Sequence, residues 1–237
     1  GGGMLYRKAY DKLLEWKNQP NKKALCIMGA RQIGKTTVIR QFGEDQYECF
    51  VEINFITDTD AGKIFAGTLD ANTIITNLTA YTRKPMIPGK TLVLLDEIQA
   101  CPDARTAIKF LVEDGRFDYI ESGSLLGVKY KEVRSYPVGF EELYQMYPMD
   151  LEEYLWANGV QNSTIQYLKD CYVNGTPVTD AIHQTMCKLF YSYIVVGGMP
   201  DVVQTYVDTH DIAQVIARQT EILELYRLDI SQYAQGN

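Results

Sequence analysis

The stretch that decides the fold is Gly29-Ala30-Arg31-Gln32-Ile33-Gly34-Lys35-Thr36. It consists of a glycine, four residues and then Gly-Lys-Thr, which is the Walker A spacing of a phosphate-binding P-loop. The apolar run over 24–28 predicts a buried strand before it, and the residues over 34–42 predict a helix after it, ended by Gly43. Strand, glycine-rich loop and helix in this order are the context that the motif requires. The stretch therefore predicts a bound nucleoside triphosphate, the alternative being a chance glycine turn.

The residues of this loop have distinct predicted tasks. Gly29 and Gly34 let the backbone turn so that its N–H groups approach phosphate oxygens, and the N-terminus of the following helix adds partial positive charge. Lys35 is expected to contact the β- and γ-phosphates, and the Thr36 hydroxyl is expected to be a ligand of Mg²⁺. The other residues expected to line the nucleotide are Ala30, Arg31, Gln32, Ile33 and Thr37.

A second apolar run, over 91–95, ends in the acids Asp96 and Glu97, which is a Walker B pattern. Such a run predicts a buried strand that delivers carboxylates at its C-terminal edge. We expect Asp96 to hold the Mg²⁺ and Glu97 to deprotonate the attacking water as a general base. Neighbouring residues of a strand point to opposite sides, so the two acids need not compete for one ligand.

Two further polar residues follow predicted strands. Ser122, near the end of the strand expected over 118–122, is a candidate for contacting the γ-phosphate or the water, with an ordinary strand-end serine as the alternative. Asn54, at the end of the strand expected over 49–55, is a candidate for holding Glu97 until a ligand arrives.

Composition limits the class of protein. The 237 residues have a formal net charge of −7, which argues against a broad nucleic-acid-binding face and leaves a local basic groove open. The five cysteines show no metal-ligand spacing and suit a reducing cytosol. Since no apolar run approaches about 18 residues and no signal peptide is visible, we expect a cytoplasmic protein without a membrane partner.

Alternating strand and helix signals predict an α/β fold in which a parallel sheet is flanked by helices. Residues 1–3 resemble a tag remnant, 4–157 are expected to form the nucleotide-binding core, and 158–237 a smaller all-helical lid domain. The glycines and proline over 195–200 interrupt this helical part. We consider two interpretations, a plain turn between helices or a loop that closes over the nucleotide base with Pro200 on the ring.

The motifs together resemble a known family, the prokaryotic AAA-type ATPases of the AAA+ superfamily that carry an extra C-terminal domain of unknown function (DUF4143-type, often described as nuclease-like). The resemblance covers nearly the whole chain. The segments that carry it are Gly29–Thr37, Leu95-Asp96-Glu97-Ile98-Gln99, Ser122-Gly123-Ser124-Leu125-Leu126, Tyr136-Pro137-Val138-Gly139-Phe140, Tyr147-Pro148-Met149-Asp150-Leu151-Glu152-Glu153 and Gly197-Gly198-Met199-Pro200.

The resemblance implies an AAA+ P-loop NTPase core, with the phosphate-loop strand in the centre of the sheet and a helical lid behind it. It implies that Ser122 is the polar sensor at the end of the fourth strand and that Pro200 lies at the adenine. An arginine finger from a neighbouring subunit is also implied. Arg134 is the candidate, with Arg31, Arg116 and Arg227 as rivals. The resemblance further implies that the C-terminal domain is missing from this chain.

The predicted function is hydrolysis of ATP with Mg²⁺, driving a movement of the core against the lid. One alternative is a slowly hydrolysing switch that gates a C-terminal effector domain or a partner, with DNA-related processes included. Another is a small-molecule kinase, although the Asp96-Glu97 pair favours water as the nucleophile. A homo-oligomer, another protein partner and nucleic acid all stay open as partners.

Overall fold

The computed structural model describes residues 5–67, 70–124 and 139–235. Its contacts divide the chain into two compact units. One contains residues 9–31, 35–146 and the stretch from Ile230 onward, and the other contains residues up to Lys8, Gln32–Gly34 and 147–229. The predicted domain boundary after Ala157 stays a prediction, and each unit is described by itself.

In the described residues, the first unit is built on a five-stranded sheet in the order β2-β3-β4-β1-β5. Each pairing is parallel, as predicted, so the carboxyl ends of the strands meet at one edge. At that edge Asp96 pairs in register with Asn54 on one side and Ser122 on the other. The strands are β1 (Ala24–Met28), β2 (Cys49–Asn54), β3 (Thr91–Asp96), β4 (Asp118–Gly123) and β5 (Glu141–Gln145).

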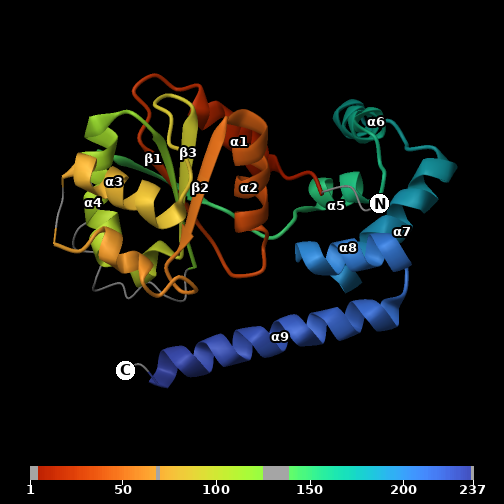
Figure 1. The fold of residues 1–237 in the computed structure, drawn as a ribbon. Helices are drawn as coiled ribbons and strands as arrows, with labels where there is room; N and C mark the ends of the chain where they lie inside the picture. Colours follow the sequence, from red (N-terminus) through yellow and green to blue (C-terminus); the bar gives the residue numbers. More distant parts are fainter. Residues whose placement is uncertain (1–4, 68–69, 125–138, 236–237) are drawn as a thin grey trace. The chain divides into compact units, whose positions relative to one another are not determined.

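Helices cover both faces of this sheet, with α1 and α2 on one side and α3 and α4 on the other (Figure 1). The predicted end of α2 at Gly43 is wrong, because the helix continues to Gln46. Packing accounts for a glycine at position 43 instead, since a Cβ there would lie 2.6 Å from the ring of Phe50. The elements are α1 (Lys8–Lys17), α2 (Lys35–Gln46), α3 (Ala71–Thr82), α4 (Pro102–Asp114) and the short 3₁₀ turns η1 (Ala61–Ile64) and η2 (Ile98–Ala100).

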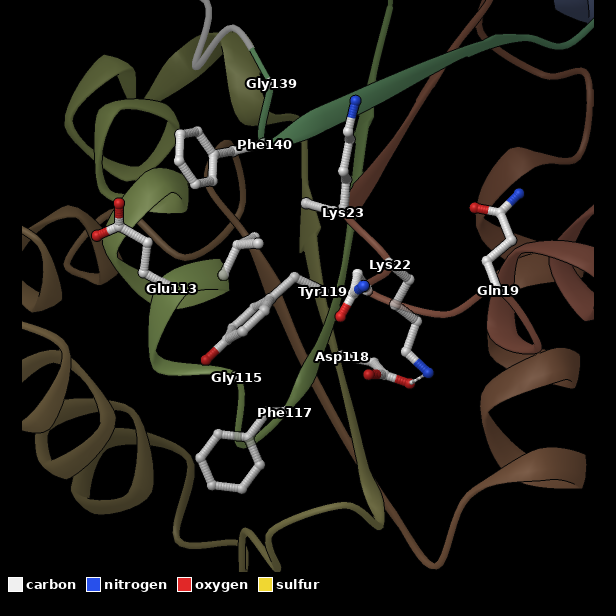
Figure 2. Close-up of a pocket in the computed structure, with 13 residues that line it drawn as sticks. Gln19, Lys22, Lys23, Glu113, Gly115, Phe117, Asp118, Tyr119, Gly139 and Phe140 are labelled. Atoms are coloured by element: carbon white, nitrogen blue, oxygen red, sulfur yellow. Dashed lines mark ion pairs between the residues drawn. The ribbon is translucent and has the colours of Figure 1, made fainter.

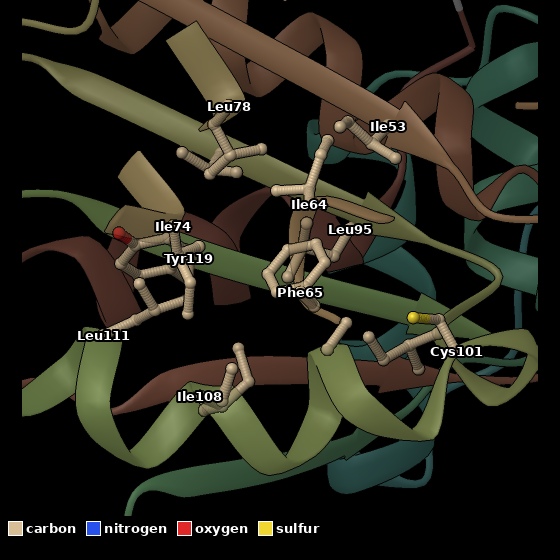
Figure 3. Close-up of a cluster of buried hydrophobic side chains, with 14 of the residues drawn as sticks. Ile53, Ile64, Phe65, Ile74, Leu78, Leu95, Cys101, Ile108, Leu111 and Tyr119 are labelled. Atoms are coloured by element: carbon tan, nitrogen blue, oxygen red, sulfur yellow. The ribbon is translucent and has the colours of Figure 1, made fainter. Parts of the chain in front are cut away.

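A large apolar cluster lies between the sheet and the helices α3 and α4 (Figure 3). Fully burying an aliphatic or aromatic side chain of this kind stabilises a fold by about 1.5–3 kcal/mol, so this layer holds the strands in their places. Its members include Ile53, Ile64, Phe65, Ile74, Leu78, Leu95, Ile108, Leu111 and Tyr119.

The second unit is helical, as predicted, and packs around Met149, Tyr154 and Val203. A capping box fixes the start of α5. In it, the Asp150 side chain accepts from the Glu153 N–H and the Glu153 side chain accepts from the Asp150 N–H. No helix of the described residues is long and apolar enough to cross a membrane. The helices of the second unit are α5 (Leu151–Ala157), α6 (Asn162–Asn174), α7 (Asp180–Val196), α8 (Pro200–Thr209) and the part of α9 (Ile212–Gln235) up to Asp229.

The paired glycines before α8 have a structural reason. Gly197 ends α7 with a φ of 77°, in the range that favours glycine. Gly198 lies against the backbone of Met149, whose N–H donates to the Gly198 carbonyl at 2.7 Å. A Cβ at Gly198 would lie 2.3 Å from the Met149 carbonyl oxygen, so no larger residue fits without a shift of the backbone.

A polar cluster is buried in the sheet unit. Cys26 Sγ and one carboxylate oxygen each from Glu121 and Glu141 lie within 4.8 Å of one another, and Arg105 Nη2 donates to Glu141 at 2.8 Å. Burial raises the pKa of Glu121 well above its usual value, and Glu141 raises it further while Arg105 lowers it. Since Arg105 already supplies the positive charge, the geometry favours a proton on Glu121 over a metal ion.

We predict that this proton makes stability depend on pH. A carboxyl whose pKa is raised on folding binds more protons folded than unfolded, so the contribution of Glu121 to wild-type stability falls as the pH rises above about 4.5, the ordinary value. Glu121→Gln keeps the shape and removes the titration. Its free energy of unfolding relative to wild type should therefore rise with pH, by up to about 1.4 kcal/mol per unit.

Denaturant unfolding between pH 5 and pH 8 measures this difference. Glu113→Gln, at an exposed position of α4, is the control and should follow the wild type. Parallel curves for Glu121→Gln and wild type would contradict a protonated Glu121.

Candidate functional site

The predicted P-loop connects β1 to α2 and has the backbone that its glycines require. Gly34 has a φ of 90°, and Gln32 also has a positive φ of 67°. The Gly29 N–H donates to the carbonyl of Gly123, at the end of β4, at 3.3 Å. The start of the loop is therefore attached to the neighbouring strand.

Lys35 turns back onto its own loop. Its Nζ donates to the carbonyls of Gly29 at 2.8 Å and Ala30 at 2.6 Å. The side chain is buried, and this burial lowers the pKa of Lys35, while Glu97 and Asp96 act in the opposite direction. A cation is thus held at the loop, with oxygen partners that phosphate oxygens can replace.

Thr36 and Asp96 lie 60 positions apart in the chain and meet in space. The Thr36 Oγ1 donates to Asp96 Oδ2 at 3.0 Å, and the N–H of Glu97 donates to Asp96 Oδ1 at 2.9 Å. Burial raises the pKa of Asp96, whereas the bond from Thr36 lowers it. A hydroxyl and a carboxylate at this distance are oxygen ligands of the kind that Mg²⁺ takes.

Ser122 lies in β4 beside Asp96 and is fully buried. In the described part of the chain its Oγ has no hydrogen-bond partner. A buried hydroxyl without a partner is unfavourable, and a phosphate oxygen or a water molecule would satisfy it.

Asn54 contacts the turn after β2. Its Oδ1 accepts from the N–H groups of Ile56 at 2.9 Å and Thr57 at 3.1 Å. Glu97 receives its side-chain hydrogen bond from Gln99 instead, at 2.5 Å. Gln99 belongs to the motif over 95–99, but the sequence indicates no role for it, because only the fold of η2 shows what its amide contacts.

The remaining predicted residues differ in burial and in their charged partners. Ile33 is buried and Thr37 is exposed on α2, while the charge of Arg31 contributes to lowering the pKa of Lys35. Arg134 lies outside the described residues. The rivals Arg116 and Arg227 are paired with Asp114 and Glu224.

By their contacts, Gln32–Gly34 belong to the helical unit. This unit also contains a buried arginine, Arg7, for which the sequence indicates no role. Arg7 Nη1 donates to the Ile33 carbonyl at 2.6 Å, and its Nε pairs with Glu153 at 2.8 Å. A Cβ on Gly34 would lie 3.1 Å from Arg7 Nη1 and 3.4 Å from Pro200 Cγ. Arg7 and Pro200 thus surround the tip of the loop.

A cavity of about 490 Å³ lies at the opposite, N-terminal edge of the strands (Figure 2). Its lining includes Lys23, Phe117, Tyr119 and Phe140, and Lys22, which pairs with Asp118. None of the predicted site residues that the structure describes lines it. It is therefore separate from the loop and its acids.

Residues 21–155 match a family described as "AAA domain". The chain belongs to this family. Residues 187–237 match a second one, described as "Domain of unknown function (DUF8612)". This is a different domain from the DUF4143 type, so that part of the resemblance is not confirmed. No curated protein sequence matches the chain.

The similarity of the chain to solved structures is distant. A RuvB variant from Thermotoga maritima has 12% identity and a TM-score of 0.47, with 86% of this chain and 61% of that chain covered. The Orc1 protein of Aeropyrum pernix in complex with DNA has 12% identity and a TM-score of 0.44, with 94% and 66% covered. This chain thus spans less than two thirds of either protein, and the fold assignment rests on the strand order and the family match.

We predict that the contributions of Arg7 and Glu153 to stability are coupled, because the two side chains pair at 2.8 Å and are 7% and 6% exposed. Removing one partner of a buried pair leaves the other charge uncompensated and costs about 3–5 kcal/mol. Arg7→Met and Glu153→Met should each lower the free energy of unfolding by about that much, and the double variant should lose less than the sum of the two.

Chemical denaturation of the single and double variants measures the coupling. Lys8→Met removes a half-exposed partner of Asp150 and is the control, with an expected loss of about 1 kcal/mol or less. Additive losses in the double variant would show that the two residues act independently.

Proposed function

We propose that this AAA protein binds ATP with Mg²⁺ and hydrolyses its γ-phosphate. The observation that carries the proposal is the 3.0 Å contact between Thr36 Oγ1 and Asp96 Oδ2, close in the chain to the Lys35 cation. Two motifs that are distant in sequence thereby supply one set of phosphate and metal ligands. A chance glycine turn does not account for this meeting.

The donor atoms fit the implied cofactor. Thr36 and Asp96 offer one hydroxyl and one carboxylate oxygen, and Mg²⁺ is typically held by one or two protein oxygens together with waters and phosphates. Mg²⁺, when bound, neutralises charge on the β- and γ-phosphate oxygens.

Each of the remaining roles in the reaction belongs to a residue of the chain. Lys35 exchanges the carbonyls of Gly29 and Ala30 for phosphate oxygens and stabilises their negative charge. The buried Ser122 Oγ gains its missing partner from the γ-phosphate or the water. Glu97 accepts a proton as the water attacks phosphorus, and ADP leaves with the electron pair of the broken P–O bond.

The same proposal includes further roles. Hydrolysis drives a movement of the core, residues 4–157, against the helical lid, residues 158–237. Pro200 lies at the adenine, and its position beside Gly34 supports a role near the loop. Arg134 acts as an arginine finger in a homo-oligomer, in a cytoplasmic setting.

We predict that Lys35→Ala weakens ATP binding. Hydrogen bonds to charged groups contribute about 1.5–3 kcal/mol each, so affinity should fall on the order of tenfold to a hundredfold. Titration calorimetry with ATP and Mg²⁺ measures it. Lys63→Ala, whose side chain is 82% exposed, is the control and should bind as wild type. Unchanged affinity in Lys35→Ala would mean that the loop does not hold the phosphates.

We predict that Glu97→Gln retains ATP binding and loses turnover by about 10²–10⁴-fold, the usual contribution of a general base. Phosphate release from purified protein measures turnover, and Glu44→Gln at an exposed position of α2 is the control. Equal turnover in Glu97→Gln and wild type would remove Glu97 from the mechanism. Wild-type turnover far below one per second, with and without candidate partners or DNA, would favour the slow switch.

A further inference from the structure

The turn after β3 contains a side chain to which the proposed mechanism gives no task. Gln99 lies in η2, two residues after Glu97, and its Nε2 donates to Glu97 Oε2 at 2.5 Å. A hydrogen bond to a carboxylate is charge-assisted and stronger than one between neutral groups. The Glu97 side chain is therefore held from within its own turn.

The backbone of Glu97 is fixed as well. Its φ and ψ of 55° and 47° are left-handed, which is costly for a residue with a side chain. The Glu97 N–H donates to Asp96 Oδ1 and its carbonyl accepts from the Ala100 N–H at 3.0 Å. Strained backbone of this kind persists where the surroundings determine it, and it gathers at functional sites.

The other end of the Gln99 amide points to the end of β4. Its Oε1 is buried and has no hydrogen-bond partner in the described part of the chain. A Cβ on Gly123 would lie 2.7 Å from this oxygen. Gly123 follows Ser122, and its carbonyl accepts from Gly29, the first residue of the P-loop. The amide thus extends from Glu97 to the place where the end of β4 contacts the P-loop.

We propose that Gln99 is a catalytic residue that orients the hydrolytic water, an inference that rests on the proposed ATP hydrolysis. Its amide N–H holds Glu97, and its amide oxygen accepts one O–H of the water while Glu97 accepts the other. A lone pair of the water oxygen is then left to form the bond to the γ-phosphorus. The bond from phosphorus to the bridging oxygen breaks, and the water proton passes to Glu97.

The amide orientation follows from this arrangement. A carboxylate offers only acceptors, so the nitrogen of Gln99 must face Glu97 and the oxygen must face away. A buried carbonyl oxygen without a donor is unfavourable, and a water molecule supplies the missing donor. Glutamine fits this place because it presents one donor and one acceptor on the same planar group.

Steady-state phosphate release from wild type, Gln99→Met, Glu97→Gln and the double variant tests the proposal. Methionine has a similar length and none of the amide hydrogen bonds. We expect Gln99→Met to lower kcat on the order of tenfold to a hundredfold with KM little changed. In the Glu97→Gln background the same change should lower kcat little further, because the effects of residues that act as a unit are not additive. Gln166→Met, at an exposed position of α6, is the control.

Gly123→Ala gives a second, independent variant. Its methyl group displaces the Gln99 amide without removing it, so kcat should fall while thermal unfolding shows that the fold is retained. Three results would overturn the proposal: an unchanged kcat in Gln99→Met, a raised kcat, which would make Gln99 a restraint on Glu97, or an equal loss in the Glu97→Gln background.

The outcomes also separate this inference from the function on which it rests. If wild-type turnover depends on Glu97 and not on Gln99, only the role of Gln99 fails. If wild type binds ATP through Lys35 and releases no phosphate, the proposed hydrolysis fails and the role of Gln99 fails with it.

Discussion

Parallel pairing of the strands is the constraint on which the rest of this structure depends. Because β2, β3, β4 and β1 run in the same direction, Asn54, Asp96, Ser122 and the start of the P-loop meet at one edge of the sheet. An antiparallel neighbour would place its carboxyl end at the far edge. The apolar layer under α3 and α4 keeps the strands in this order, and it therefore supports the site although it lies outside it.

The fold was predictable because its signals are local. Apolar runs bounded by turns indicated the five strands, and the order of strand, glycine loop and helix indicated the P-loop. The sequence predicted the fifth strand over 143–147, whereas β5 spans Glu141–Gln145, because glutamates such as Glu141 and Glu142 are uncommon in strands. Glu141 is accommodated there by Arg105, a partner 36 positions away that no local pattern reveals.

The site was predictable only as far as its residues belong to motifs. The patterns indicated that Lys35, Thr36 and Asp96 belong to one site, and in the structure Lys35 bonds to its own loop while Thr36 contacts Asp96. Arg7 and Gln99 could not be recognised, because their importance lies in which carbonyl or carboxylate they contact after folding. Side chains that position other side chains leave little trace in a single sequence.

The burial of Cys26 has a practical consequence. It lies in the middle of β1, fully inaccessible, and burial raises the pKa of its thiol well above the usual value. Only the thiolate reacts readily with alkylating reagents, so this position is doubly protected while the sheet is intact. Modification of Cys26, followed by mass spectrometry of its peptide, would therefore report the opening of the strand that leads into the P-loop, without any added label.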